Sequence, residues 1–111
     1  MGGFDKDDFS LKWFRLSLRE QMGNIGSEFD RAISWRSKGR SDFAMNAFDR
    51  TLDLLDLTIA DPRWRGPKLK ELTRTREIIC DMFIGDNAYG ATPASLSRYF
   101  LQFAIAARML K

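Results

Sequence analysis

Apolar side chains recur every three or four residues along four stretches of the chain, the spacing that places them on one face of an α-helix. The first and longest stretch spans residues 9–38, and the others span 42–60, 67–84 and 93–110. The stripe of the first stretch consists of Leu11, Phe14, Leu18, Met22, Ile25, Phe29 and Ile33. No stretch alternates with the period of two that a half-buried strand needs, so we predict an all-α protein.

Residues that start and stop helices separate these stretches. Ser41 and the Thr92-Pro93 pair are typical of helix starts, Pro67 suits a first helical turn, and Gly39 and Gly85 are typical stops. The connections are short, and short connections favour antiparallel neighbours. The pattern therefore predicts an up-down-up-down four-helix bundle, with residues 1–111 forming a single domain.

The first predicted helix is too long for such a bundle. At 1.5 Å per residue it would extend about 45 Å, against roughly 25–30 Å for the others. If it is continuous, about three turns project beyond the bundle. Alternatively it breaks between Asn24 and Ser27, because Gly23 and Gly26 disfavour a helix interior and Ser27 suits a new N-cap.

The first half of this helix is apolar on two opposite faces. Phe9, Trp13 and Leu16 lie opposite the main stripe, and Leu101 and Ile105 lie opposite the main stripe of the last helix. The leading hypothesis is a non-enzymatic protein–protein interaction module that self-associates through these residues, most simply as a two-fold homodimer. The alternative is that the first part of the helix folds back over the bundle.

Composition narrows the chemistry further. The chain has no histidine and one cysteine, Cys80, which excludes histidine-based triads, imidazole bases and Cys-rich zinc sites. We therefore predict no catalytic residue, no metal and no cofactor. No apolar run reaches 18 residues, so we expect no membrane span, and the lone cysteine favours a cytoplasmic setting.

A net charge of +3 permits a nucleic-acid partner. The segment 63–70 mixes cations with an indole, and Arg63, Trp64, Arg65 and Lys68 are the candidate ligands for phosphate and a stacked base. The alternative function is therefore a nucleotide- or RNA-binding accessory protein. The structural alternative is that Trp64 caps the core and the cations are solvated.

Arg76 interrupts the apolar stripe of the third predicted helix. A buried guanidinium needs a carboxylate, and we expect an ion pair with Asp53, Asp56 or Glu28; alternatively Arg76 holds an anion inside the bundle. The second predicted helix also carries carboxylates along one line, at Asp42, Asp49, Asp53 and Asp56. Such a row is typical of a solvated face, and a magnesium-dependent enzyme is the weakest hypothesis.

Three segments carry a family resemblance: QMGNIGSE at 21–28, DLTIADPRW at 56–64 and GDNAYG at 85–90. They resemble those of an uncharacterised bacterial family of small helical proteins, which implies a helical fold and no particular chemistry. The helix outline also resembles HEPN bundles (higher eukaryotes and prokaryotes nucleotide-binding). That resemblance implies pairing with a nucleotidyltransferase or ribonuclease activity, but the ribonuclease motif of the family requires a histidine, which this chain lacks.

Overall fold

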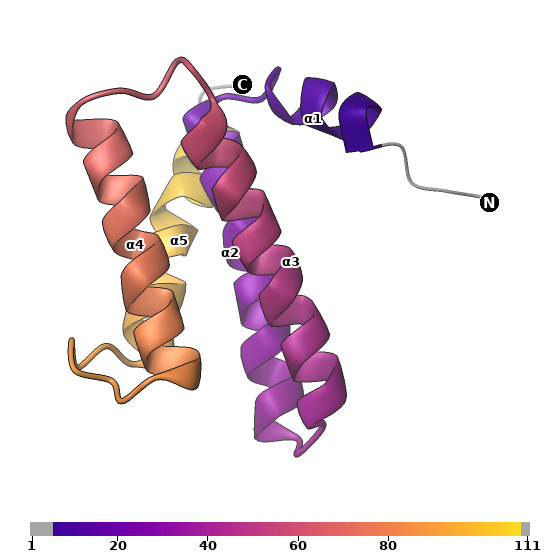
Figure 1. Ribbon diagram of the computed structural model, residues 1–111, viewed down its shortest axis with the longest axis vertical. Coiled ribbons are helices and arrows are strands. Elements are labelled where there is room, and N and C mark those ends of the chain that lie inside the picture. The colour runs from indigo at the N-terminus through magenta and orange to yellow at the C-terminus, as the bar shows by residue number, and fades with distance from the viewer. Residues whose placement is uncertain (1–5, 110–111) are drawn as a thin grey trace.

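Five helices form the part of the chain that the structure describes (Figure 1). This computed structural model describes the backbone of residues 6–109 and the side chains of residues 8–109. The helices are α1 (Lys6–Trp13), α2 (Leu18–Ser37), α3 (Ser41–Ala60), α4 (Pro67–Ile84) and α5 (Pro93–Met109). The all-α prediction is confirmed, with no strand in residues 6–109, whereas the four-helix count is wrong because the first predicted helix is two helices.

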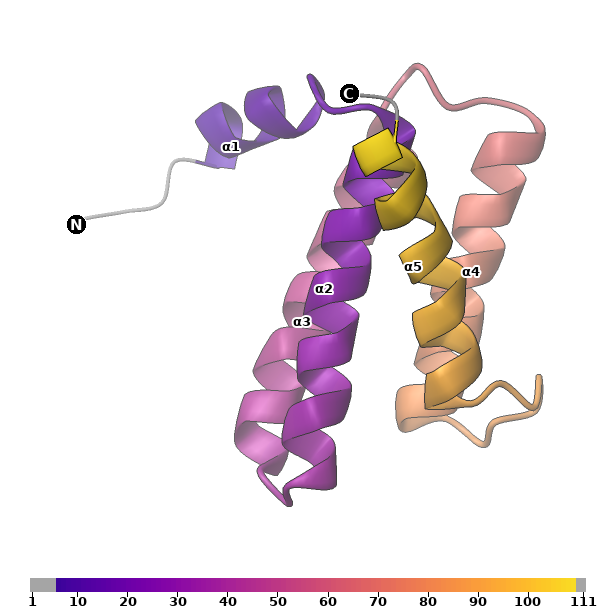
Figure 2. The same cartoon turned by 180° about the vertical axis from the view of Figure 1, so that it is seen from behind.

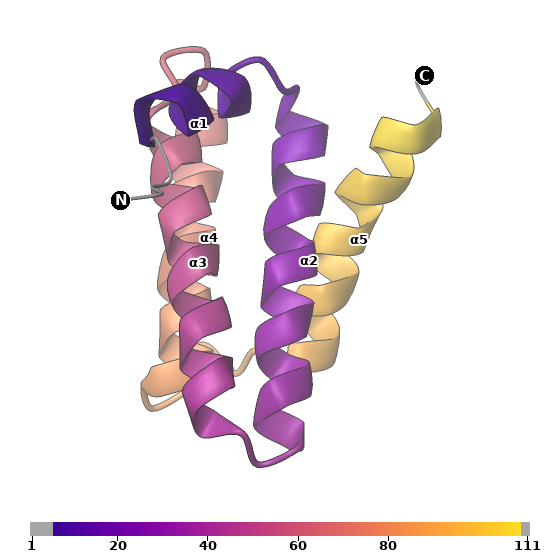
Figure 3. The same ribbon diagram turned by 90° about the vertical axis from the view of Figure 1, so that its right-hand side faces the viewer.

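Among the four long helices, the α2–α3 pair is central. α5 packs along α2 and α4 packs on α3 (Figures 1 and 2). α1 crosses the upper end of the α2–α3 pair, on the face that points away from α4 (Figure 3). The largest fully buried apolar side chains fill the space between the helices: Met22, Ile25, Phe29, Phe48, Leu55, Leu72, Ile79 and Phe100. Within residues 6–109, none of the helices has both the length and the apolarity that crossing a membrane demands.

The break in the first predicted helix lies at residues 14–17, ten residues before the position expected from the glycines. Ser17 is the N-cap of α2, and its hydroxyl accepts a hydrogen bond from the backbone N–H of Glu20 at 3.1 Å. The Glu20 carboxylate in turn accepts from the backbone N–H of Ser17 at 2.9 Å. This reciprocal capping box satisfies two backbone donors that a helix start leaves unpaired, which stabilises a new helix at this point.

The predicted break between Asn24 and Ser27 is therefore wrong. α2 runs without interruption through Gly23 and Gly26, and both glycines lie against α5. The other helix boundaries agree with the sequence prediction more closely. α4 begins at Pro67 and has Gly85 as its C-cap, and Thr92 and Ser95 exchange hydrogen bonds at the start of α5. Ser41 does not cap α3, because Arg40 occupies the N-cap position.

Candidate functional site

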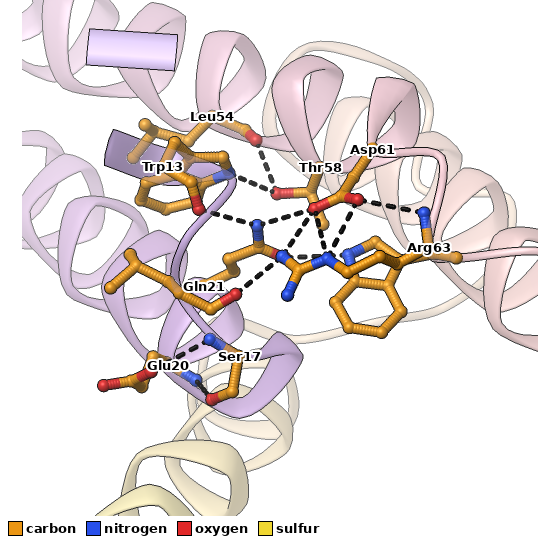
Figure 4. Close-up of polar contacts among 10 residues, drawn as sticks. Trp13, Ser17, Glu20, Gln21, Leu54, Thr58, Asp61 and Arg63 are labelled. Carbon is orange, nitrogen blue, oxygen red and sulfur yellow. Dashed lines mark hydrogen bonds and ion pairs between the residues drawn. The ribbon is translucent and has the colours of Figure 1, made fainter. Parts of the chain in front are cut away.

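A buried polar network lies where the chain turns from α1 into α2, at the end of the molecule that also holds the α3–α4 loop (Figure 4). Its centre is the Gln21 side chain, which is fully buried. The Gln21 amide nitrogen donates to the carbonyl oxygen of Trp13 at 3.0 Å and to the Asp61 carboxylate at 3.2 Å. Its amide oxygen accepts from the indole nitrogen of Trp64 at 2.9 Å. One side chain of α2 thus connects α1 with the α3–α4 loop.

Trp13 anchors α1 to the body of the protein. Its side chain is 4% exposed, and its indole Nε1 donates to the hydroxyl of Thr58 on α3 at 2.9 Å. Phe9, one turn earlier, stacks on the indole with ring centroids 6.0 Å apart. Trp13 is therefore not part of an exposed apolar face, and the prediction of Trp13 as an interface residue is wrong because α1 folds back and buries it. Phe9 and Leu16 are half-buried.

Asp61 and Arg63 form an ion pair beside Gln21. The Asp61 side chain is 1% exposed, and its carboxylate accepts from the guanidinium of Arg63 at 2.7 Å and from the Arg63 backbone N–H at 3.0 Å. The same guanidinium donates to the carbonyl oxygen of Leu16 at 2.7 Å. The Arg63 hydrogen bonds hold the pKa of Asp61 below its usual range, although desolvation opposes them. Asp61 is therefore ionised at neutral pH.

The polar groups of this network are paired with one another. Within the described residues, every buried side-chain nitrogen and oxygen has a hydrogen-bond partner. The Thr58 hydroxyl donates to the carbonyl oxygen of Leu54 at 2.8 Å, and the Asp61 carboxylate accepts from both Gln21 and Arg63. We call Trp13, Gln21, Thr58, Asp61 and Arg63 the α1 clamp, since together they fix α1 against α2 and α3.

The predicted phosphate ligands divide into two groups. Arg63 and Trp64 hydrogen-bond inside the chain. The structural alternative expected this of Trp64, whereas it expected the Arg63 cation to be solvated. Arg65 and Lys68 are exposed, and the Lys68 ammonium lies 5.3 Å from the centre of the Trp64 ring. The first two side chains thus have a role in the fold, although the Arg63 side chain is still 41% exposed, and the second two are presented to solvent.

The ion pair expected for Arg76 is present. Its guanidinium donates to both carboxylate oxygens of Asp56, at 2.7 and 3.2 Å. This pairing raises the pKa of Arg76, and Cys80 lies beside the same guanidinium, with its sulfur 3.9 Å from a guanidinium nitrogen. In the described part of the chain, no three side chains of the His, Cys, Asp and Glu types come together as metal ligands would.

Two surfaces with apolar side chains lie outside the clamp and could take part in association. The first is a groove of about 670 Å³ between α1, α2 and α3. Its apolar lining is Phe9, Leu54 and Leu57, and its charged lining is Glu28, Arg50, Asp53 and Asp56. We call these seven residues the α1 groove. It exists because the clamp places α1, and hence Phe9, over the α3 helix.

The second surface runs along the outer side of α5. Leu101, Ile105 and Met109 are spaced four residues apart and are 51%, 44% and 77% exposed. We call these three residues the α5 strip. Two of the five predicted interface residues, Leu101 and Ile105, belong to it. Arg98 and Arg108, both exposed, lie on the same outer side of the helix.

Three members of the clamp, Gln21, Thr58 and Asp61, were not predicted from the sequence. The only local signal was the Ser17-x-x-Glu20 capping pattern, which marks the start of α2 and therefore the turn that the clamp closes. Gln21 and Asp61 are 40 residues apart in sequence, so their contact has no local signal.

Neither a family model, nor a curated protein, nor a solved structure matches this chain.

Proposed function

We propose that this protein is a non-enzymatic interaction module that self-associates through the α5 strip. The observation that carries the proposal is the exposure of Leu101, Ile105 and Met109 at helical spacing. The inner side of α5 already packs on α2 through Leu96 and Phe100, which are 7% and 2% exposed. α5 is therefore apolar on two sides, and only one side is covered within the chain.

Burial of this strip would be favourable. Apolar area removed from water contributes roughly 25 cal/mol per Å², against which the loss of rotational and translational freedom must be set. Three adjacent large side chains on one helix give a continuous ridge, and such ridges are the usual contact elements between helices. The sequence pattern placed the interface mainly on the first predicted helix, whereas we now propose that it lies on α5.

The absence of an enzymatic role is part of the same proposal. Two findings support it: the sequence contains no histidine, and the buried polar groups of the α1 clamp are saturated with internal hydrogen bonds. A general acid or base needs a proton site that a substrate can reach. The clamp offers none, because its carboxylate is enclosed by Arg63 and Gln21.

Sedimentation equilibrium of the wild type and the Ile105→Asp variant tests the proposal. We expect the wild type to associate in the micromolar range and the variant to remain a monomer, because a carboxylate cannot be buried in an apolar contact. Ala94→Asp is the matched control, since it places the same charge at an exposed position in the first turn of α5. A wild type that stays monomeric at high micromolar concentration refutes self-association.

A second candidate function, RNA or other polyphosphate binding, is favoured by the charge at the clamp end of the molecule. The α1–α2 turn, the α3–α4 loop and the end of α5 meet there (Figure 1). They bring exposed cations that pair with none of the described carboxylates: Arg15, Arg19, Arg65, Lys68 and Arg108.

Fluorescence anisotropy with a single-stranded RNA probe tests this second function. We expect affinity that falls steeply with salt and weakens in Arg65→Ala, because phosphate contacts release bound counterions. Arg40→Ala, at the opposite end of α2 and α3, serves as the control. An RNA probe that is not retained even at low salt removes this candidate.

A further inference from the structure

The α5 strip and the α1 groove are complementary to each other. We propose that copies associate head to tail, with the α5 strip of one copy seated in the α1 groove of the next. This inference rests on the proposed self-association and specifies both of its surfaces. It requires a second copy of the same chain and no other partner.

The shapes of the two surfaces are complementary. The α5 strip is a ridge one helix wide, formed by side chains at positions i, i+4 and i+8. The α1 groove is concave, and its apolar floor comes from Phe9 on one side and from Leu54 and Leu57 on the other. An amphipathic helix that lays its apolar side in such a groove is a recurring mode of protein recognition.

The charges around the two surfaces are also complementary. The groove is lined by three carboxylates and one guanidinium. Glu28 is shared between Arg31 and Arg50, and Asp56 is paired with Arg76, whereas Asp53 forms no ion pair with any described cation. The strip is flanked by two arginines, Arg98 and Arg108, that pair with none of the described carboxylates.

This distribution of charge selects one arrangement among three. Two strips in contact would bring four arginine side chains together, and two grooves in contact would bring two concave surfaces and two unpaired Asp53 carboxylates together. A strip in a groove places Arg98 and Arg108 near the Asp53 carboxylate, the one carboxylate of the lining that pairs with no described cation, since Glu28 and Asp56 are already paired with arginines. Opposite charges across an interface favour encounter and register, and like charges disfavour them.

The positions of the two surfaces determine the kind of assembly. The groove lies on the side of the α2–α3 pair that carries α1, and α5 lies beyond α2 (Figure 3). Because the two surfaces are different and lie on different elements, the contact is heterologous. Each copy then uses both surfaces, and the assembly either closes into a ring or continues as a chain. The α1 clamp acquires a role here, because it holds Phe9 in the groove.

A mixing experiment distinguishes this arrangement from any symmetric dimer. Ile105→Asp disables the strip and leaves the groove intact, and Leu57→Asp disables the groove and leaves the strip intact. Each variant alone should be monomeric by sedimentation. An equimolar mixture should form a one-to-one dimer that grows no further, because one intact strip and one intact groove remain per pair.

The outcomes separate the two proposals. If the wild type associates, Ile105→Asp is monomeric and the mixture stays monomeric, the head-to-tail arrangement is overturned while self-association through α5 stands. A wild type that is monomeric at high micromolar concentration overturns both. A Leu57→Asp variant that is folded and associates as strongly as the wild type also overturns the head-to-tail arrangement, because the groove is then not used.

Charge reversal on exposed positions gives a second test that does not depend on a half-buried residue such as Leu57. Asp53→Arg alone, or Arg98→Asp with Arg108→Asp, should each raise the dissociation constant roughly two- to fivefold. Combining all three substitutions in one chain should recover part of the lost affinity, because the new cation at position 53 then faces carboxylates at positions 98 and 108. A combined variant that is weaker than either parent overturns the pairing of these surfaces.

Discussion

Phe100 of α5 lies directly over Gly26 of α2, so closely that a Cβ at position 26 would overlap the Cβ of Phe100. The Phe100 ring also packs against Phe29, with centroids 5.7 Å apart, and is almost fully buried. About one turn earlier, a Cβ at Gly23 would lie 3.2 Å from the Cβ of Ala104. These contacts set the distance between α2 and α5, and α5 carries the proposed interaction surface.

Replacing Gly26 with alanine should destabilise the protein despite the better helix propensity of alanine. The propensity gain is about 1 kcal/mol, whereas overpacking a core contact costs about 1–3 kcal/mol, and here backbone or Phe100 must move. We expect urea unfolding to show a net loss of up to about 2 kcal/mol. Gly23→Ala is the milder comparison. A Gly26→Ala protein that is more stable than the wild type would contradict the α2–α5 packing.

The same glycines show where sequence reasoning fails. Their low helix propensity is real, and it predicted a break near Gly23 and Gly26. The helix continues there because close packing of α5 compensates for the propensity, and that packing comes from residues about 75 positions away. Local signals sufficed where the boundary itself is local, as at Pro67 and Gly85. Local signals could not identify a glycine that is needed because another helix packs closely against it.

The capping box at the start of α2 is expected to contribute measurably to stability. Ser17→Ala removes the acceptor for the Glu20 backbone N–H, and loss of an N-cap typically costs about 1 kcal/mol. Chemical denaturation of this variant should show a loss of that size. Ser34→Ala, at an exposed position inside α2, should stay within about 0.5 kcal/mol of the wild type. Equal effects of the two substitutions would show that the cap contributes nothing specific.

The turn between α1 and α2 was partly predictable. The Ser17-x-x-Glu20 pattern was present in the sequence, but the apolar spacing continues from Phe14 to Leu18 across the turn and conceals it. From the sequence, a fold-back of the first helical segment over the bundle was one of two alternatives. Only the structure identifies the residues that hold α1 in that position. Trp13 and Thr58 are 45 residues apart, so no window of the sequence contains their hydrogen bond.

The Asp61 carboxylate should make stability depend on acid pH. Its pKa is lowered in the folded protein, chiefly by hydrogen bonds from Arg63, and an aspartate in an unfolded chain has a pKa of about 3.9. The folded state therefore binds this proton less tightly than the unfolded state does. The resulting stabilisation is fully present above about pH 4 and is lost as the pH falls through the folded pKa. Urea titrations at a series of acid pH values measure it.

Two variants identify Asp61 as the source of that dependence. Asp61→Asn should lower the stability at neutral pH, because it leaves the Arg63 guanidinium without its carboxylate, and it should flatten the acid part of the profile. Asp56→Asn, which breaks the more exposed pair with Arg76, should lower the stability at neutral pH by less than Asp61→Asn does. An Asp61→Asn profile that is as steep as that of the wild type would rule out this assignment.

Tyr99 should resist ionisation in the folded protein. Burial is the main cause that raises its pKa, and its hydroxyl also donates a hydrogen bond to the Glu71 carboxylate, which favours the neutral phenol. In a Tyr89→Phe background Tyr99 is the single tyrosine, and its tyrosinate absorbance should appear well above the usual pH of about 10. Adding Glu71→Gln should lower this pKa only in part, because burial remains. A folded protein, monitored by circular dichroism, whose Tyr99 titrates near pH 10 would show that α5 does not pack against α4 at this position.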